Sequence, residues 1–219
     1  AETGVSLVGG ETAEHPGLLG VDDYDVAGAA TGVVEADEML DPSKVRDGDV
    51  VLALASSGLH SNGFSLVRKI VADNGWDIRQ QRPDFSRELG LELLEPTMLY
   101  TQSLLSVMAS HPGALHMLSH VTGGGIAQNL SRVIPPELAV DVDRSTWSPP
   151  AVMRVLADAG GFALGQVEDT WNMGMGMVAL VDPASSEAVL DSLRSAGHSA
   201  WQAGVVRTRV TADSEGATT

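Results

Sequence analysis

Residues 50–73 read VVLALASSGLHSNGFSLVRKIVAD, and three successive patterns in this stretch decide the fold. The apolar run Val50–Ala55 predicts a strand, and Ser56–Gly63, rich in glycine, serine and asparagine, predicts a loop. Apolar residues then recur at helical spacing and predict a helix, with Ser61 or Asn62 as its N-cap. The residues on that helical face are Phe64, Val67, Ile70 and Val71.

The same patterns extend along the chain in both directions. Further strands are predicted at Val5–Val8, Tyr24–Val34, Leu115–Val121, Asn172–Val181 and Ala200–Val206. Further helices are predicted from Pro96 to about Ser110, from Ile126 to Val133, from Ser148-Pro149-Pro150 (with Ser148 as cap) to Gly160-Gly161, and from Asp182-Pro183 to Gly197. Strands and helices do not alternate strictly, so we expect an α/β (α+β) fold, a mixed β-sheet with helices layered on it.

The regions between these elements divide the chain. Turn residues at Asp41-Pro42-Ser43 and Asp47-Gly48-Asp49 predict a boundary near residue 40, with residues 41–206 forming the main domain. Residues 75–95 show no clear period and are predicted to be a loop. Residues 207–219 have little to bury and are predicted to be a flexible tail.

Composition narrows the class of protein. The 219 residues carry a formal net charge of −16. Residues 1–50 contain twelve Asp and Glu residues but only two basic residues, Lys44 and Arg46. Such a surface repels nucleic acid and anionic membranes, so we expect neither as a partner. Residues 96–131 contain no Asp, Glu, Lys or Arg, but polar residues and glycines interrupt every apolar run well short of a membrane span. The chain has no cysteine and shows no secretion signal, which predicts a cytoplasmic location.

Two glycine-bearing loops follow predicted strands and suit phosphate chemistry. In the first, Gly9 and Gly10 would allow close backbone approach, Thr12 could donate to a phosphate, and Glu11 and Glu14 could hold Mg²⁺. An ordinary Gly-Gly turn before an acidic helix start explains this loop equally well. In the second, backbone amides and serine hydroxyls between Ser56 and Gly63 could cradle a phosphate, the alternative being a capped turn. There His60 could contact phosphate, transfer a proton, or be a hydrogen-bonded structural histidine.

Two further segments complete the candidate residues. Thr122-Gly123-Gly124-Gly125 links a strand to a helix, and it is either a turn that wraps closely around a ligand or a hinge. Asn172 begins the glycine-rich stretch Asn172–Met177 and could face a site, whereas the methionines there belong more naturally to the core. The six histidines show no zinc spacing.

Taken together, five segments resemble signatures of aminoimidazole ribonucleotide synthetase and follow that family's order. They are LVGGETAEHPG, DYDVAGAATGVVE, LALASSGLHSNGFSLVRKI, HVTGGGIAQNLSRVIP and TWNMGMGMVAL. The resemblance implies cyclisation of formylglycinamidine ribonucleotide to aminoimidazole ribonucleotide through an iminophosphate, with ATP and Mg²⁺. It also implies a homodimer in the full-length protein.

By position, the resemblance assigns a role to each loop. Gly9, Gly10 and Thr12 would bind nucleotide, Glu11 and Glu14 would bind Mg²⁺, and His60 would be catalytic. The residues expected to bind the phosphoribosyl substrate are Ser57, Ser61, Asn62, Gly63, Thr122, Gly123, Gly124, Gly125 and Asn172. The family's N-terminal glycine-rich segment is not in this chain. We therefore expect a fragment that is inactive alone, in which residues 1–40 are the remnant of an ATP-binding and dimerisation domain.

Other interpretations remain at this stage. Formylglycinamide ribonucleotide amidotransferase and thiamine monophosphate kinase belong to the same superfamily and carry related Gly-Gly turns, but the His60-Ser61-Asn62-Gly63 loop resembles them less. A different class of function is a non-catalytic module that binds phosphate or docks to a missing half.

Overall fold

The computed structural model describes residues 2–210 and 217–218, and the chain divides into two compact units. The first unit is Ala1–Met39 and the second is Leu40–Thr219. Each unit is described by itself.

The first unit has no regular secondary structure among residues 2–39, so the strands predicted at Val5–Val8 and Tyr24–Val34 do not form. The apolar side chains there are exposed, with Leu7 at 95% and Val8 at 94%. A strand is stabilised by hydrogen bonds to a neighbouring strand and by burial of one face, and these residues have neither. Apolar alternation alone therefore misled the prediction.

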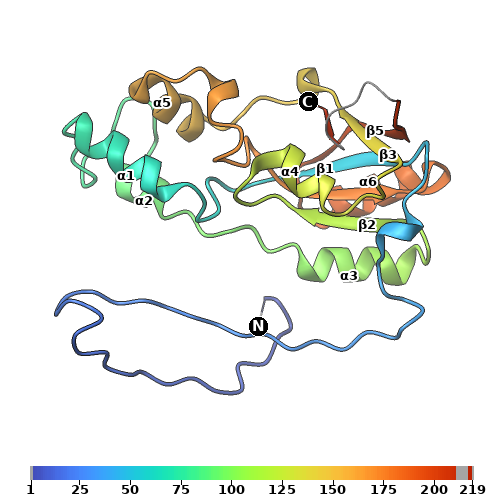
Figure 1. Cartoon of the computed structure of the whole chain (residues 1–219), viewed down its shortest axis with the longest axis horizontal. Helices are drawn as coiled ribbons and strands as arrows, with labels where there is room; N and C mark the ends of the chain where they lie inside the picture. The colour runs from blue at the N-terminus through green and yellow to red at the C-terminus, as the bar shows by residue number, and fades with distance from the viewer. Residues whose placement is uncertain (1, 211–216, 219) are drawn as a thin grey trace. The chain divides into compact units, whose positions relative to one another are not determined.

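The second unit is built on one six-stranded sheet (Figure 1). Its strands are β1 (Val50–Ala55), β2 (Leu115–His120), β3 (Leu138–Val142), β4 (Met175–Val181), β5 (Ala200–Thr208) and β6 (Ala217–Thr218). The spatial order is β2-β4-β1-β5-β3-β6, in which β3 and β6 pair in parallel and every other neighbouring pair is antiparallel. The predicted mixed sheet is confirmed.

Strand β1 lies in the middle of this order and is buried on both faces. Because side chains alternate along a strand, Leu52 and Leu54 enter one hydrophobic core, while Val51 and Ala53 enter the other. The apolar run at the start of the deciding segment thus fills two cores at once. A sheet covered on both faces needs helices on both sides.

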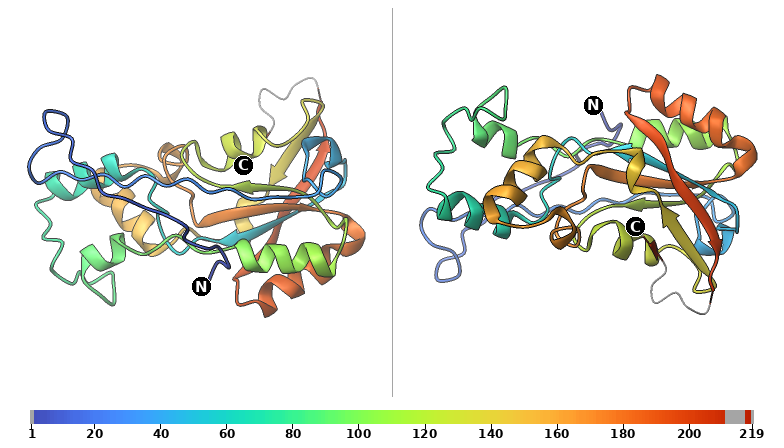
Figure 2. Two further views of the ribbon diagram at one scale, coloured as in Figure 1. Left: turned by 90° about the horizontal axis from the view of Figure 1, so that it is seen from below. Right: turned by 90° about the horizontal axis from the view of Figure 1, so that it is seen from above.

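The helices form those covering layers. They are α1 (Phe64–Asp73), α2 (Leu89–Leu93), α3 (Thr101–Ser110), α4 (Gly125–Ser131), α5 (Ala151–Gly160) and α6 (Ser186–Ser195). Figure 2 shows α3 and α6 side by side on one face of the sheet and α4 on the other. Helices α1 and α5 contact each other and gather with α2 beyond one end of the sheet (Figure 1). Short 3-10 turns occupy Pro42–Lys44, Arg144–Thr146, Leu164–Gln166 and Pro183–Ser185.

Several helix starts differ from the predictions. Helix α1 has Gly63 at its N-cap in a left-handed conformation, so neither Ser61 nor Asn62 caps it. Helix α5 has Pro150 at its N-cap, so Ser148 does not cap it. Helix α3 begins at Thr101 instead of Pro96, because the intervening residues extend along the Ser56–Gly63 loop and bond to it.

The strands and loops also need correction. Strand β3 was not predicted, α2 forms within the predicted loop 75–95, and β4 begins at Met175 after a turn. Strand β5 continues to Thr208, so residues 207 and 208 are not part of a flexible tail. Arg207 is held there by an ion pair between its Nε and Asp141 Oδ2 at 2.7 Å. Residues 211–216 and 219 of the predicted tail lie outside the described residues.

Candidate functional site

The Ser56–Gly63 loop connects β1 to α1 through an unusual backbone. His60 and Ser61 both adopt positive φ angles, 53° and 61°, which residues with a side chain rarely do. Gly63 follows with φ 70°, and a Cβ added there would lie 2.6 Å from the Trp171 ring. A backbone bent in this way costs free energy and persists only where surrounding contacts enforce it. The glycine is required by both conformation and space.

His60 supplies the main enforcing contact. Its imidazole is 5% exposed, and Nε2 accepts hydrogen bonds from the backbone N–H groups of Ser57 (2.9 Å) and Met98 (3.2 Å). A nitrogen that accepts N–H donors carries no proton, so the neutral ring is protonated at Nδ1. Burial, with a smaller contribution from His120, lowers the pKa of His60 to about 4. His60 is therefore neutral near pH 7 and ties the loop to the segment before α3.

Asn62 joins this loop to the triple-glycine turn. Its Nδ2 donates to His60 O (2.8 Å), and its Oδ1 accepts from Gly123 N (3.1 Å). The two bonded residues are 61 positions apart in sequence, and this amide joins the two loops predicted to bind the substrate. Ser61 is exposed beside the bridge. The Ser57 hydroxyl is already used, because it donates to Pro96 O at 2.5 Å.

The backbone of Glu168 and Asp169 packs tightly against the Thr122–Gly125 turn. Gly125 has φ 66°, and a Cβ there would overlap the backbone carbonyl of Glu168. Gly124 N donates to Asp169 O at 2.9 Å. Asn129 closes the turn by donating from Nδ2 to Gly125 O at 2.7 Å. Close approach therefore explains Gly125, whereas a Cβ at Gly123 would have no neighbour within 4 Å.

Asn172 is in the interior and not on a cleft. The residue is 0% exposed, and its Oδ1 accepts from Ser56 Oγ (3.0 Å) and Gly174 N (2.8 Å). Its Nδ2 donates to Gly58 O at 2.9 Å. With its amide bonded at both ends, Asn172 supports the Ser56–Gly63 loop from behind and does not line an open site, which corrects the sequence-based expectation.

The glycine loop of the first unit is organised differently. No side chain or backbone lies within 4 Å of a Cβ placed at Gly9 or Gly10. Among the described residues, no hydrogen bond or ion pair involves Glu11, Thr12 or Glu14. Carboxylates and a hydroxyl are the oxygen ligands that Mg²⁺ prefers. No group of three or more His, Asp or Glu side chains in the described part of the chain is gathered to hold a metal.

Two features near these loops were not predicted. A small hollow beside the triple-glycine turn is lined by Ile126, Ala127, Arg144, Glu168 and Asp169. Arg144 Nη2 and Glu168 Oε2 form an ion pair there at 2.5 Å. The second feature is a group of rings formed by His60, Tyr100, His120 and His198. A sequence signal existed for His120, since it directly precedes the segment Val121–Gly125.

The fold and these loops define a C-terminal domain of the AIR synthase type. Residues 46–213 match the family described as AIR synthase related protein, C-terminal domain, and the chain belongs to this family. It is 44% identical over 208 residues to the phosphoribosylformylglycinamidine cyclo-ligases of Synechococcus elongatus and of another Synechococcus strain. The alignment covers 94% of this chain and 61% of each relative, whose C-terminal portion it spans.

Solved structures share the fold at low sequence identity. The hydrogenase maturation protein HypE is 18% identical with a TM-score of 0.52, covering 80% of this chain and 49% of that one. Thiamine-monophosphate kinase from Stenotrophomonas maltophilia is 16% identical with a TM-score of 0.55, covering 84% and 54%. At these identities the likeness concerns the fold alone. Within the described residues, no helix is long and apolar enough to cross a membrane.

Proposed function

We propose that this chain supplies the substrate side of an ATP-dependent cyclo-ligase, which converts formylglycinamidine ribonucleotide to aminoimidazole ribonucleotide in purine biosynthesis. The observation that carries the proposal is 44% identity to two named cyclo-ligases over 208 residues, which is 94% of this chain. The bridge from Asn62 Oδ1 to Gly123 N supports it, because it brings two of those loops together.

In this proposal the chain mainly positions the substrate. Exposed Ser61 and the backbone amides around Gly63 would contact the phosphoribosyl group, while His60, Asn62 and Asn172 hold the loop that presents them. The amides of Gly123 and Gly124 already donate to Asn62 Oδ1 and Asp169 O, so the triple-glycine turn would serve as a wall beside the ligand. Fixed donors that need no rearrangement favour binding and orientation. When bound, ATP would activate the formyl oxygen as a phosphate ester and make it a good leaving group.

The nucleotide side of the proposal rests on the first unit. Glu11 and Glu14 would hold Mg²⁺, and Gly9, Gly10 and Thr12 would contact ATP. Their oxygen donors suit the ion, but they are not gathered into a site among the described residues. We propose that the remaining portion of a full-length cyclo-ligase orders them, in a cytoplasmic homodimer that binds neither nucleic acid nor membrane.

A turnover assay tests the function. We expect residues 1–219 alone to show no ATP-dependent ring closure, and we expect activity when the N-terminal portion of the Synechococcus elongatus relative, outside the aligned region, is added. Robust turnover by the chain alone would contradict the proposal that the nucleotide site requires the remaining portion of the enzyme. No turnover in the mixture, with intact full-length relative as the positive control, would weigh against the function.

A second candidate function is a non-catalytic module that binds phosphate or docks to a partner. Among the described residues, Glu11, Thr12 and Glu14 make no hydrogen bond or ion pair and are not gathered into a metal site, and this favours the second function. In the same assay, this function predicts binding of a phosphorylated ligand without turnover under either condition.

A further inference from the structure

Four aromatic rings converge near the ends of β1 and β2, next to the proposed substrate loops. The His60 ring lies 6.2 Å from Tyr100 and 6.3 Å from His120, centroid to centroid. Tyr100 lies 6.4 Å from His120 and stacks on His198 at 5.5 Å. We call these four residues the ring cluster. Of them, only His60 was assigned a role from the sequence, although His120 is the first residue of the motif HVTGGGIAQNLSRVIP.

Three members of the ring cluster are held by hydrogen bonds within the chain. His60 Nε2 accepts from two backbone amides, as described above. The Tyr100 hydroxyl donates to Ala55 O at 2.7 Å, and His198 Nε2 lies 2.7 Å from the Ser103 hydroxyl. A Cβ at Gly176 would overlap the Tyr100 hydroxyl and approach His60 Cε1 to 2.7 Å, so the neighbouring strand β4 fixes these two rings closely.

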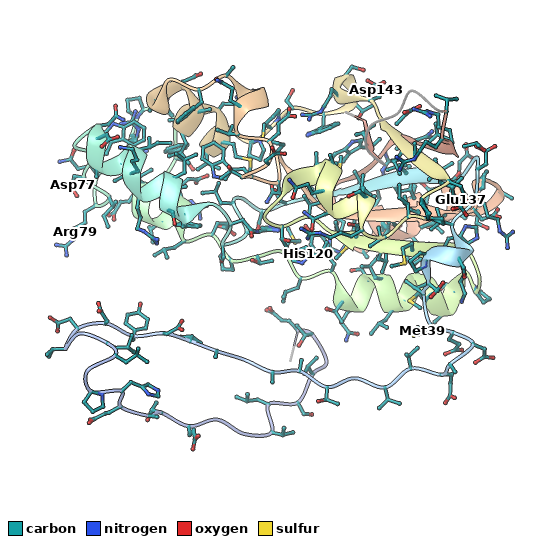
Figure 3. All side chains as sticks on the ribbon, in the orientation of Figure 1. Met39, Asp77, Arg79, His120, Glu137 and Asp143 are labelled. Carbon is teal, nitrogen blue, oxygen red and sulfur yellow. The ribbon has the colours of Figure 1, made fainter. Side chains whose placement is uncertain are left out.

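His120 differs from the other three. Its side chain is exposed, and no hydrogen bond joins its imidazole to another residue in the described ranges 2–210 and 217–218. It is the last residue of β2, and Figure 3 shows it where that strand ends and the chain continues toward α4. The next residues are Val121 and the Thr122–Gly125 turn. A histidine in this place adjoins both candidate loops.

The surroundings of His120 keep its ring neutral. Although His120 is exposed, its neighbours remove part of the ring from water, and this partial desolvation lowers its pKa below the ordinary value for histidine. The titratable rings that contact it are His60, neutral because its pKa is about 4, and Tyr100, whose pKa is raised by burial. On β4 its partner is the uncharged Met177, and residues 96–131 contain no charged side chain. A neutral imidazole offers one donor and one acceptor, and neither has a partner among the residues that the structure describes.

We propose that His120 is the imidazole that contacts the substrate in this site, hydrogen-bonding to a hydroxyl or N–H group of a phosphoribosyl ligand. His60 then acts as a positioning residue, which shapes the loop and packs beside His120. The proposal rests on the proposed function for its ligand class. Protonation of His120 removes its acceptor, so the hydrogen bond to the ligand weakens as the pH falls through the pKa of His120.

Nuclear magnetic resonance on the 219-residue chain tests this proposal with ribose 5-phosphate as the probe. The imidazole ¹⁵N shifts of His120 should change on addition of the probe, together with backbone amides of Ser57–Gly63 and Gly123–Gly125. The His60 ring should remain a neutral Nδ1–H tautomer throughout. If the loop amides shift while the His120 nitrogens do not, His120 has no such role and the proposed function stands. If neither shifts, the proposal for His120 fails, and the turnover assay judges the function separately.

A matched pair of variants sharpens the test. His120→Gln should weaken binding of ribose 5-phosphate about tenfold, equivalent to the loss of one good hydrogen bond. His111→Gln is the control, because His111 bonds to Ser192 Oγ just after the far end of α3 and should leave binding unchanged. The ratio of the two affinities cancels titration of the probe's own phosphate. That ratio should shrink as the pH falls, and a ratio near one at every pH would overturn the proposal.

Discussion

Two glycine-bearing loops that look alike in the sequence differ in the structure, because one is held by tertiary contacts and the other is not. The Ser56–Gly63 loop joins a buried strand to a helix, and three other segments hydrogen-bond to it, through the backbone amides of Met98 and Gly123 and the side chain of Asn172. The Gly9–Glu14 loop lies among residues 2–39, which form no strand, and no described residue comes within 4 Å of a Cβ placed at Gly9 or Gly10. A glycine-rich loop is flexible by itself, so it becomes a defined site only when a packed frame holds it.

The largest expected effect is a loss of stability when the packing around the triple-glycine turn is disturbed. Gly125→Ala adds a methyl group that overlaps the Glu168 carbonyl at a backbone conformation unfavourable for alanine. We expect a loss of about 2–4 kcal/mol in unfolding free energy, measured by chemical denaturation. Gly123→Ala is the matched control two residues away, where the methyl group meets nothing within 4 Å. Equal stability of the two variants would show that the turn is not packed as described.

The next effect concerns the histidine that holds the loop. His60→Ala leaves the part-buried N–H groups of Ser57 and Met98 without their acceptor, and each lost hydrogen bond costs about 0.5–1.5 kcal/mol. Thermal unfolding should therefore shift down by several degrees, at about 2–4 °C per kcal/mol for a domain of this size. His15→Ala, at an exposed position in the first unit, should leave the melting temperature unchanged. An unchanged melting temperature in His60→Ala would instead free His60 for a direct catalytic role.

The same histidine predicts a dependence of stability on pH. The folded pKa of His60 is about 4, below the ordinary value of 6.5. Between these values the unfolded chain binds a proton that the folded chain does not, so this contribution to stability is complete above pH 6.5 and is lost as the pH falls toward 4. The difference in unfolding free energy between wild type and His60→Ala should therefore narrow over this window. A constant difference from pH 7 to pH 4 would mean that His60 does not titrate as described.

The smallest expected effect is removal of the first unit. Both hydrophobic cores consist of residues from Leu40 onward, so deletion of residues 1–39 takes nothing from them. The melting temperature of the second unit should change by no more than about 2 °C, an effect below 1 kcal/mol. A large drop would show that the first unit contributes to the folded domain in solution.

The sequence predicted local features well where one pattern had one explanation. Val50–Ala55 is a strand to the residue, because an apolar run beside a glycine-rich loop and an amphipathic helix fits few other structures. The predicted start of α3 was wrong, because a proline such as Pro96 fits an extended segment as well as it fits the first turn of a helix. Its true conformation depends on bonds to Ser57 and His60, and these are tertiary contacts.

The site shows the same division between local and tertiary information. The motifs placed Asn62, Gly63 and Gly125 in loops that the structure brings together. They could not distinguish a residue that lines a site from one that supports it, and Asn172 proved to be fully buried. The exposed state of His120 depends on which rings pack beside it, and no spacing in the sequence specifies that.

Backbone hydrogen exchange tests most directly the contrast between the packed second unit and the first unit, which has no regular secondary structure among residues 2–39. In the chain alone, amides of residues 50–55 should be strongly protected, while those of residues 5–8 and 24–34 should exchange at rates near those of an unfolded peptide. When the N-terminal portion of the Synechococcus elongatus relative is added, residues 5–8 and 24–34 should become protected as they gain partner strands. Strong protection of these residues in the chain alone would contradict the account, as would the absence of any gain on addition.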